Sequence, residues 1–278
     1  MSPVVGKLPV SAVDAGLVLK VLEPIWTKKP ETASRVRGRM EAVLDWAKAR
    51  GYRTGENPAR WRGHLDHLLP AKAKVRKVEH HAALPYARIG AFLTAVRKQN
   101  GIAARALEFL VLTATRTGET LGATWNEVDL SAKLWTIPAA RMKAGKEHRV
   151  PLSDATLAVL QQMQEIRHSD YVFPGGRDLR PLSETSLLML LRRMRHGDIT
   201  AHGFRSTFRD WAAECTTFAR EEAEMALAHA IPDAVEAAYR RGDLFEKRRK
   251  LMGAWAAYCA KVETDASKVV ALARVRPQ

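Results

Sequence analysis

The sequence predicts an α+β fold that is mainly α-helical and contains a small antiparallel β-sheet. Three observations predict this fold class. Apolar residues recur at helical spacing over most of the chain. Two short segments rich in β-branched and aromatic residues, 134–137 and 149–152, enclose a basic stretch with one glycine, which indicates a hairpin. After Leu182 the pattern is helical again.

The first 70 residues predict a small basic bundle of helices. Residues 14–22 are apolar at helical spacing, and Pro24 limits this first helix. Residues 31–50 predict a longer helix, for which Gly51 is a stop signal. Its inner stripe is expected to contain Val36, Met40, Val43, Leu44 and Ala47. A short helix from residue 57 is expected to have an apolar side formed by Trp61, Leu65 and Leu68.

Basic residues in this part of the chain are candidates for binding a polyanion. The outer side of the longer helix carries Arg35, Arg37 and Arg39. Residues 71–85 have no hydrophobic period and many charges, and they end at a proline, so they predict an interdomain linker. The linker is either a solvated connection or a strap along a DNA backbone, and its basic residues are Lys72, Lys74, Arg76 and Lys77.

Residues 86–278 predict a second domain. Segments 86–97 and 103–115 indicate helices, and the hairpin strands follow them. Residues 171–173 indicate a third short strand. The catalytic candidates described below all lie in this domain.

The charge balance suggests a polyanionic partner. The formal net charge is +15 at pH 7 and the isoelectric point is near 10.1. Nucleic acid fits best, because basic side chains that neutralise phosphates release counterions; an anionic membrane surface is the alternative. The first 77 residues hold 16 Lys or Arg against 7 Asp or Glu, so the excess is concentrated at the start of the chain.

Several protein classes are disfavoured. Cys215 and Cys259 form no Cys-x-x-Cys pair, which argues against a zinc site and a disulfide framework and favours a reducing compartment. No apolar run approaches the ~20 residues of a membrane helix, and no signal-peptide pattern is present. Neither an acidic two-metal cluster nor a glycine-rich phosphate loop stands out, so we expect no metal and no nucleotide cofactor. We expect a soluble cytoplasmic protein.

Polar residues that interrupt apolar helical patterns are the candidates for chemistry. Arg116 follows the apolar run 107–112, and a buried arginine is costly unless it meets an anion. That anion is either Glu119, in a structural salt bridge, or a phosphate. His202 and Arg205 are three residues apart and share one face of a helix.

His229 and Tyr239 complete the set, although each alone is a weak signal. His229 stands in the apolar sequence Ala-Leu-Ala-His-Ala, where a satisfied core histidine is the ordinary interpretation. Tyr239 lies on an alanine-rich helical pattern, where a packing role is the ordinary interpretation. The order of the whole set carries more information than any of its members.

That order resembles the tyrosine recombinase (phage integrase) family. The family's signature is an arginine, a lysine in a β-hairpin, His-x-x-Arg, a histidine and a tyrosine. Here it reads Arg116, Lys143, His202, Arg205, His229 and Tyr239. The sequences Glu-Ala-Ala-Tyr-Arg-Arg-Gly-Asp and Arg-Met-Lys are similar to those of prophage and genomic-island integrases. The resemblance implies a helical core-binding domain at 1–70, a linker at 71–85 and a catalytic domain with a C-terminal tail at 86–278.

The resemblance also implies the role of each residue. Tyr239 would be the nucleophile, forming a covalent 3′-phosphotyrosine, with His202 accepting its proton or positioning the acceptor. Arg116 and Arg205 would hold the phosphate oxygens, with a hydrogen bond from His229. Lys143 would be the general acid, although Lys146 remains an alternative and Arg141 is easily mistaken for it. Glu119 would be the accessory carboxylate.

The implied activity is site-specific DNA integration and excision of a prophage or genomic island. The implied partners are double-stranded attachment sites, a tetrameric synaptic complex and accessory DNA-bending proteins, and the implied location is the bacterial nucleoid. Residues 244–278 would dock on a neighbouring protomer. Relatives usually carry an arm-binding domain, and this chain begins partway into the core-binding region, which predicts a truncated or short variant. The alternatives are type IB topoisomerase-like relaxation and a non-enzymatic DNA-binding protein of the same fold.

Overall fold

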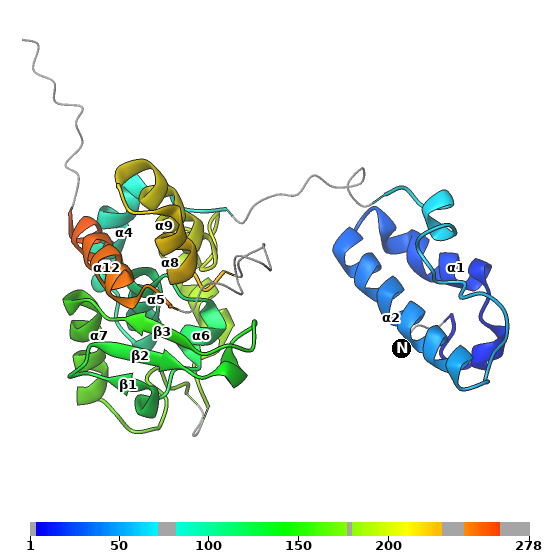
Figure 1. Ribbon diagram of the computed structural model, residues 1–278, viewed down its shortest axis with the longest axis horizontal. Coiled ribbons are helices and arrows are strands. Elements are labelled where there is room, and N and C mark those ends of the chain that lie inside the picture. The colour runs from blue at the N-terminus through cyan, green and yellow to red at the C-terminus, as the bar shows by residue number, and fades with distance from the viewer. Residues whose placement is uncertain (1–3, 72–81, 177–179, 230–241, 262–278) are drawn as a thin grey trace, which may run out of the picture. The chain divides into compact units, whose positions relative to one another are not determined.

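The computed structural model describes residues 4–71, 82–176, 180–229 and 242–261. Its internal contacts divide the chain into two compact units, residues 1–80 and 81–278. Figure 1 shows the helices of the first unit in blue and the second unit from cyan to orange. The division falls within the stretch predicted as a linker, 71–85. Most of that stretch lies outside the described residues, so the linker stays a prediction.

The first unit is built on two helices, α1 (Ala15–Trp26) and α2 (Pro30–Ala49), with 3-10 turns at Val10–Ala12 and Leu65–His67. The carboxylate of Asp14 caps α1 by accepting the Leu17 N–H at 2.8 Å. The prediction that Pro24 limits the first helix was wrong, since α1 continues to Trp26. Trp26 is buried, stacks on Trp61 and donates its indole N–H to the Pro70 carbonyl at 2.9 Å, so tertiary contacts hold the turn of α1 that follows the proline.

The inner face of α2 differs in part from the predicted stripe. Leu44 and Ala47 are buried and Val36 and Met40 are partly buried, but Val43 is 59% exposed. A helix turns by 100° per residue, so Val43 lies off the line of contact with α1 and borders an apolar groove of about 570 Å³.

The short helix expected from residue 57 is also absent from the described part of the first unit. That stretch forms turns and one 3-10 segment, because Gly63 takes a left-handed conformation with φ of 71°. Leu65 is buried as predicted, but the break leaves Leu68 54% exposed.

The second unit contains a three-stranded antiparallel sheet in the order β1-β2-β3, surrounded by helices. The strands are β1 (Val128–Asp129), β2 (Leu134–Ile137) and β3 (His148–Pro151), and Trp135 of β2 pairs with both Val128 and Val150. The described helices are α4 (Ile89–Arg97), α5 (Ile102–Thr113), α6 (Thr117–Leu121), α7 (Asp154–Glu165), α8 (Glu184–Arg193), α9 (Gly203–Cys215), α10 (Arg220–Ala226) and α12 (Phe245–Ala260). Short 3-10 segments are Tyr86–Arg88, Trp125–Glu127 and Ala139–Arg141.

This arrangement confirms the predicted fold class, a mainly helical protein with a small antiparallel sheet. The third strand predicted at 171–173 was wrong. Tyr171 forms only an isolated bridge with Thr124, and the Val172 N–H donates to the Ala123 carbonyl. Two such contacts hold the segment against the preceding loop without extending the sheet.

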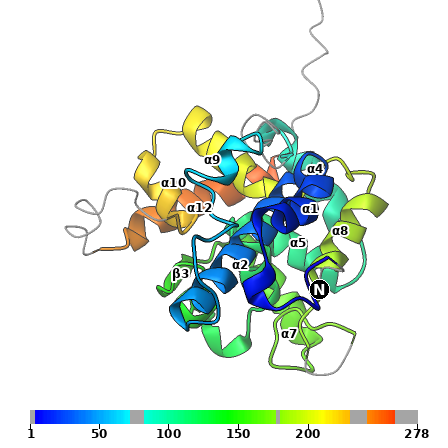
Figure 2. The same cartoon turned by 90° about the vertical axis from the view of Figure 1, so that its right-hand side faces the viewer.

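Helix α5 is the centre of the second unit. Every residue from 104 to 113 except Arg105 is buried, and helices α4, α7, α8, α9 and α12 all contact α5. The indole N–H of Trp255 on α12 donates to the Val111 carbonyl at 2.8 Å, which fixes α12 on α5. Figure 2 shows α9 and α10 in yellow beside α12 in orange, and α10 contacts both. None of the described helices is long and apolar enough to cross a membrane.

Candidate active site

Arg116 lies in the turn that follows the C-terminal end of α5. Ala114 ends the helix in the left-handed conformation, with φ of 52°, and Arg116 then becomes the N-cap of α6. Three buried threonine hydroxyls make a continuous chain of hydrogen bonds through this turn, from Thr113 to Thr115 at 2.9 Å and from Thr115 to Thr120 at 2.8 Å. These internal bonds fix the backbone from which the Arg116 side chain extends.

Arg116 is held by Glu119, one turn into α6. The Arg116 backbone N–H donates to Glu119 Oε2 at 2.8 Å, and its Nη1 donates to Oε1 at 2.6 Å. Glu119 is only 4% exposed, whereas the Arg116 side chain is 24% exposed. The guanidinium therefore pairs with Glu119 on one side and is still partly exposed. Arg116 can form the structural salt bridge and bind a phosphate at the same time.

Arg205 lies beside Arg116 and is almost completely buried. His202 is the exposed N-cap of α9, and Arg205 follows in the first turn, 4% exposed. Arg205 Nη1 donates to the Ala114 carbonyl at 2.6 Å, and Nη2 donates to the Leu227 carbonyl. Burial and then the charge of Arg116 lower the pKa of Arg205 to about 10, so it remains charged at neutral pH.

Carbonyl groups at the ends of two helices accept hydrogen bonds from these arginines. The chain just beyond α10 also contains an alanine in the left-handed conformation, Ala228, two residues after the helix, whose φ is 48°. Its Leu227 and Ala228 carbonyls accept from Arg205 and Arg116, the latter bond measuring 3.1 Å. The final carbonyls of a helix lack helical partners and carry the negative end of its dipole. Two non-glycine residues in this strained conformation beside one cluster also mark it as a candidate functional site.

His229 joins the cluster directly after this turn. Its Nε2 lies 3.1 Å from Arg205 Nη2, and its Nδ1 lies 2.5 Å from Glu224 Oε2. The other oxygen of Glu224 accepts from Arg209 Nε at 2.7 Å. Burial raises the pKa of Glu224, but the hydrogen bonds with His229 and Arg209 outweigh burial and lower it overall. The predicted residues Arg116, Glu119, Arg205 and His229 are thus brought together.

The hairpin lysines lie on the loop between β2 and β3. Lys143 and Lys146 are both exposed, so the choice between them stays open. Arg141 on the same loop has a structural role: Nη1 donates to Glu127 and Nη2 donates to the Glu119 carbonyl at 2.6 Å. Because these contacts occupy the Arg141 guanidinium, the two lysines remain the candidates for the general acid.

The predicted nucleophile Tyr239 lies outside the described residues, as do Lys72, Lys74, Arg76 and Lys77. The described chain resumes at residue 242, and Asp243 is firmly anchored. Arg248 of α12, with a side chain 1% exposed, donates to the Asp243 carbonyl at 2.6 Å and to its carboxylate at 2.7 Å. Arg248 also donates to the Arg149 carbonyl of β3 at 2.6 Å. The residue four positions after Tyr239 is therefore tied to the hairpin strand.

His148 is a further buried polar residue of this region that sequence reasoning missed. It is the first residue of β3 and is 9% exposed. Burial and then the charge of Arg248 lower its pKa to about 4, against the opposing charge of Glu119. His148 is consequently neutral at pH 7 beside the arginine cluster.

The arginines of α2 differ in their surroundings. Arg35 has a side chain that is 73% exposed, and it pairs with Glu31 at 3.4 Å. Arg37 has an internal role, because its Nη1 donates to Glu41 at 2.7 Å and to the Ala59 carbonyl at 2.9 Å. Arg39 is exposed beside the apolar groove. DNA binding by these arginines stays a prediction.

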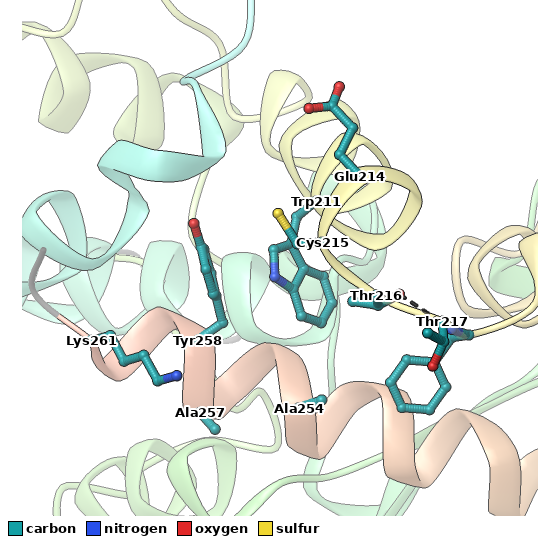
Figure 3. A pocket seen from close by; sticks show the side chains of 10 residues that line it. Trp211, Glu214, Cys215, Thr216, Thr217, Ala254, Ala257, Tyr258 and Lys261 are labelled. Carbon is teal, nitrogen blue, oxygen red and sulfur yellow. Dashed lines mark hydrogen bonds between the residues drawn. The ribbon is translucent and has the colours of Figure 1, made fainter.

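A separate cavity of about 820 Å³ lies between the C-terminal ends of α9 and α12. Figure 3 shows Trp211 and Cys215 on α9 facing Tyr258 of α12, with Lys261 at the rim. The residues that line it include none of the arginine cluster. Among the described residues, no group of three or more His, Cys, Asp and Glu side chains is suitable for holding a metal ion.

Both units of the chain match patterns of known protein families. The phage integrase family pattern matches residues 85–243, and the phage integrase central domain matches residues 1–64. Prophage integrase IntZ of Escherichia coli K12 is 32% identical over 90% of this chain and 61% of its own length. The integrase of Enterobacteria phage P4 is 29% identical over 83% of this chain and 55% of its own. The chain thus spans about three fifths or less of the length of these relatives.

Solved structures share the fold at low identity. A lambda integrase dimer bound to a core site has a TM-score of 0.60 at 18% identity, covering 80% of this chain and 81% of that one. The Tn1549 transposon integrase in complex with circular intermediate DNA has a TM-score of 0.56 at 15% identity, covering 85% and 88%. With the family pattern matched over more than half of its residues, the chain belongs to the phage integrase family of tyrosine recombinases.

Proposed function

We propose that this protein is a site-specific DNA recombinase that cleaves and rejoins DNA through a covalent 3′-phosphotyrosine at Tyr239. One observation carries the proposal: Arg116, Arg205 and His229 converge from α6, α9 and the end of α10 on one place. Two guanidiniums close together are suited to an anion with several oxygens. A phosphodiester is such an anion.

The reaction would proceed by two in-line transesterifications. The Tyr239 oxygen attacks phosphorus, the bond to the 5′-oxygen breaks, and Lys143 protonates the leaving oxygen as general acid. His202 takes the tyrosine proton or positions its acceptor. A 5′-hydroxyl then reverses the attack and releases the tyrosine. The phosphodiester bond energy is retained in the intermediate, so the steps require no nucleotide cofactor.

Arg116 and Arg205 would bind the non-bridging oxygens, whose negative charge grows in the transition state, and His229 would add a hydrogen bond. Donors fixed in advance cost no reorganisation, and losing one typically lowers a rate by about 100- to 1000-fold. Glu119 would hold Arg116 in place, and the carbonyls at the ends of α5 and α10 would hold Arg205. This rigidity supports the assignment.

The proposed partners are double-stranded attachment sites, further copies of this chain and accessory DNA-bending proteins. The net charge of +15 supports a DNA partner, and Arg35, Arg37, Arg39, Lys72, Lys74, Arg76 and Lys77 are the proposed backbone contacts. A lambda integrase of the same fold was solved as a tetramer bound to a Holliday junction. By analogy we propose a tetrameric synaptic complex, integration and excision of a prophage or genomic island, and a cytoplasmic location at the nucleoid.

Trapping of a covalent adduct tests the proposal. The substrate is a pool of nicked duplexes with a randomised central sequence, from which the cleaved strand end diffuses away and leaves the protein attached. We expect the wild-type chain to yield denaturation-resistant adducts and Tyr239→Phe to yield none. Tyr52→Phe, a matched change at a residue 60% exposed on the first unit, is expected to trap as much as wild type. Adducts at equal yield in Tyr239→Phe, or none with wild type, would contradict the proposal.

A further inference from the structure

Glu224 connects the candidate site to a second layer of side chains. It lies in the last turn of α10, and its side chain is 25% exposed. Each carboxylate oxygen has its own partner: Oε1 accepts from Arg209 Nε at 2.7 Å, and Oε2 lies 2.5 Å from His229 Nδ1. The left-handed turn at Ala228 folds His229 back over the helix end, which makes the second contact possible.

The hydrogen-bond partners of His229 determine where its proton lies. A guanidinium only donates hydrogen bonds, so His229 Nε2, 3.1 Å from Arg205 Nη2, accepts one and carries no proton. The proton of the neutral ring is therefore on Nδ1, from which it is donated to Glu224. Glu224, His229 and Arg205 thus form a directed chain in which each bond fixes the next.

We propose that Glu224 is a positioning residue that holds His229 in its Nδ1–H tautomer and thereby directs Nε2 at Arg205 and the phosphate-binding side of the cluster. The proposal rests on the proposed function of this site and adds a residue to it. A carboxylate at one ring nitrogen orients a catalytic histidine in the same way in the Ser-His-Asp triad. It thereby keeps Nε2 available as an acceptor for Arg205, the guanidinium proposed to bind the phosphate.

Both carboxylate oxygens of Glu224 are needed as acceptors, one for Arg209 and one for His229 Nδ1. A glutamine has one acceptor oxygen and one donor group. If its oxygen accepts from Arg209, its NH₂ faces His229 Nδ1, which must then become an acceptor. The proton moves to Nε2, where it opposes the donor on Arg205. Glu224→Gln is almost the same size as the natural residue, so it changes this pattern of donors and acceptors with little change in packing.

The test combines nitrogen NMR with cleavage kinetics on the whole chain. His229 is identified among the nine histidines by the signal lost in His229→Asn. In wild type we expect Nδ1 to carry the proton, and in Glu224→Gln we expect the proton on Nε2. The rate of covalent adduct formation on a selected nicked duplex is expected to fall about 10- to 100-fold in Glu224→Gln, less than for loss of a direct phosphate donor. DNA affinity and thermal midpoint are expected to stay near wild type.

A second change should reverse the first. In the double variant Glu224→Gln/Arg209→Met, the amide oxygen is released from Arg209 and can accept from Nδ1 again. We expect the Nδ1–H tautomer and most of the cleavage rate to return. Glu221→Gln, the same change at an exposed glutamate one turn earlier on α10, is the control for charge and is expected to leave both unchanged.

The outcomes separate this proposal from the proposed function. A wild-type His229 protonated on Nε2, or a Glu224→Gln variant with the tautomer and rate of wild type, would overturn the role of Glu224. Failure of the double variant to restore the tautomer would also count against it. If wild type forms no adduct, the proposed function fails, while the NMR measurement still reports whether Glu224 sets the tautomer.

Discussion

At the scale of single residues, the pair Arg116–Glu119 has both a structural and a proposed functional role. Glu119 is 4% exposed and binds both the guanidinium and the backbone N–H of Arg116. Removing one partner of a buried ion pair leaves an uncompensated charge, which costs more than the pair itself contributes. The site therefore depends on Arg116 for its stability as well as for the proposed binding of a phosphate.

This leads to a prediction for Arg116→Ala. We expect the free energy of unfolding, measured in urea, to fall by about 3 kcal/mol because Glu119 is left buried without its guanidinium. The double variant Arg116→Ala/Glu119→Gln should recover at least ~1 kcal/mol, since a neutral amide is less costly to bury. A double variant no more stable than the single one would show that the buried charge is not the cause.

His148 gives a prediction about pH. Its pKa is lowered from 6.5 to about 4 in the folded state, so the unfolded chain binds more protons between these values. Its contribution to stability is therefore complete above pH 6.5 and is lost as the pH falls toward 4. From pH 7 to pH 5 the loss attributable to this one group is ~2 kcal/mol.

The measurement compares wild type with His148→Gln by urea unfolding at both pH values. Carboxylates contribute equally to the two proteins, so the difference between them isolates His148. We expect wild type to lose more stability than the variant on acidification. Equal losses in the two proteins would mean that His148 titrates in the folded state much as it does in the unfolded one.

The sequence predicted the candidate catalytic residues, because their order along the chain matches a family signature. It did not predict the residues that hold them in place. Arg116, Glu119, Arg205 and His229 were all predicted, and the structure brings them together. Glu224 was missed because a spacing of five residues does not place two side chains on one face of a straight helix. The left-handed turn at Ala228 brings Glu224 to His229. The sequence Met-Ala-Leu-Ala-His does not predict that turn, because glycine is the residue usually found at such a position.

At the scale of elements, the site is assembled from helix ends. Arg116 lies between the end of α5 and the start of α6, His202 is the N-cap of α9, and His229 follows the end of α10. Helix ends expose unpaired N–H and carbonyl groups, so charged side chains gathered there find partners without breaking regular structure. The buried body of α5 then fixes these ends relative to one another.

Helix α12 ties the chain that follows residue 241 to the sheet. Arg248 is fully buried and joins Asp243 to the backbone of β3. In Arg248→Met the Arg149 carbonyl loses its partner, and we expect unfolding to become easier by about 2 kcal/mol. Asp243 adds little to this loss because its side chain is 40% exposed and can be hydrated.

The matched control is Lys250→Met, the same kind of change at an exposed position two residues later on α12. It is expected to change stability by less than about 0.5 kcal/mol. Chemical denaturation of both variants checks the prediction. Equal stabilities for the two variants would show that the contacts of Arg248 do not hold this part of the fold together.

Element boundaries were predicted less well than element types. The hairpin and most of the helices were anticipated, but α6 and α7 were not. Pro24 did not end α1, and residues 57–70 and 171–173 formed neither the helix nor the strand expected. Tertiary contacts prevailed over the local pattern in α1 and at residues 171–173, whereas a left-handed glycine interrupted the pattern after residue 57. The stacking of Trp26 on Trp61 and the left-handed Gly63 are examples that spacing alone does not reveal.

At the scale of the whole molecule, the chain consists of two units that differ in composition and in the family pattern they match. The first is basic and helical and matches the phage integrase central domain, and the second contains the arginine cluster and matches the phage integrase family. Fold class and family membership followed from the sequence because they depend on many residues at once. The segment that contains Tyr239, the proposed nucleophile, lies outside the described residues.

The central claim is that Tyr239 attacks phosphorus within the Arg116–Arg205–His229 cluster. The most direct measurement is tandem mass spectrometry of the trapped protein–DNA adduct after digestion of protein and DNA. The account predicts a nucleotide joined through its 3′-phosphate to the peptide that contains Tyr239. Attachment to any of the other four tyrosines, or through a 5′-phosphate, would contradict it.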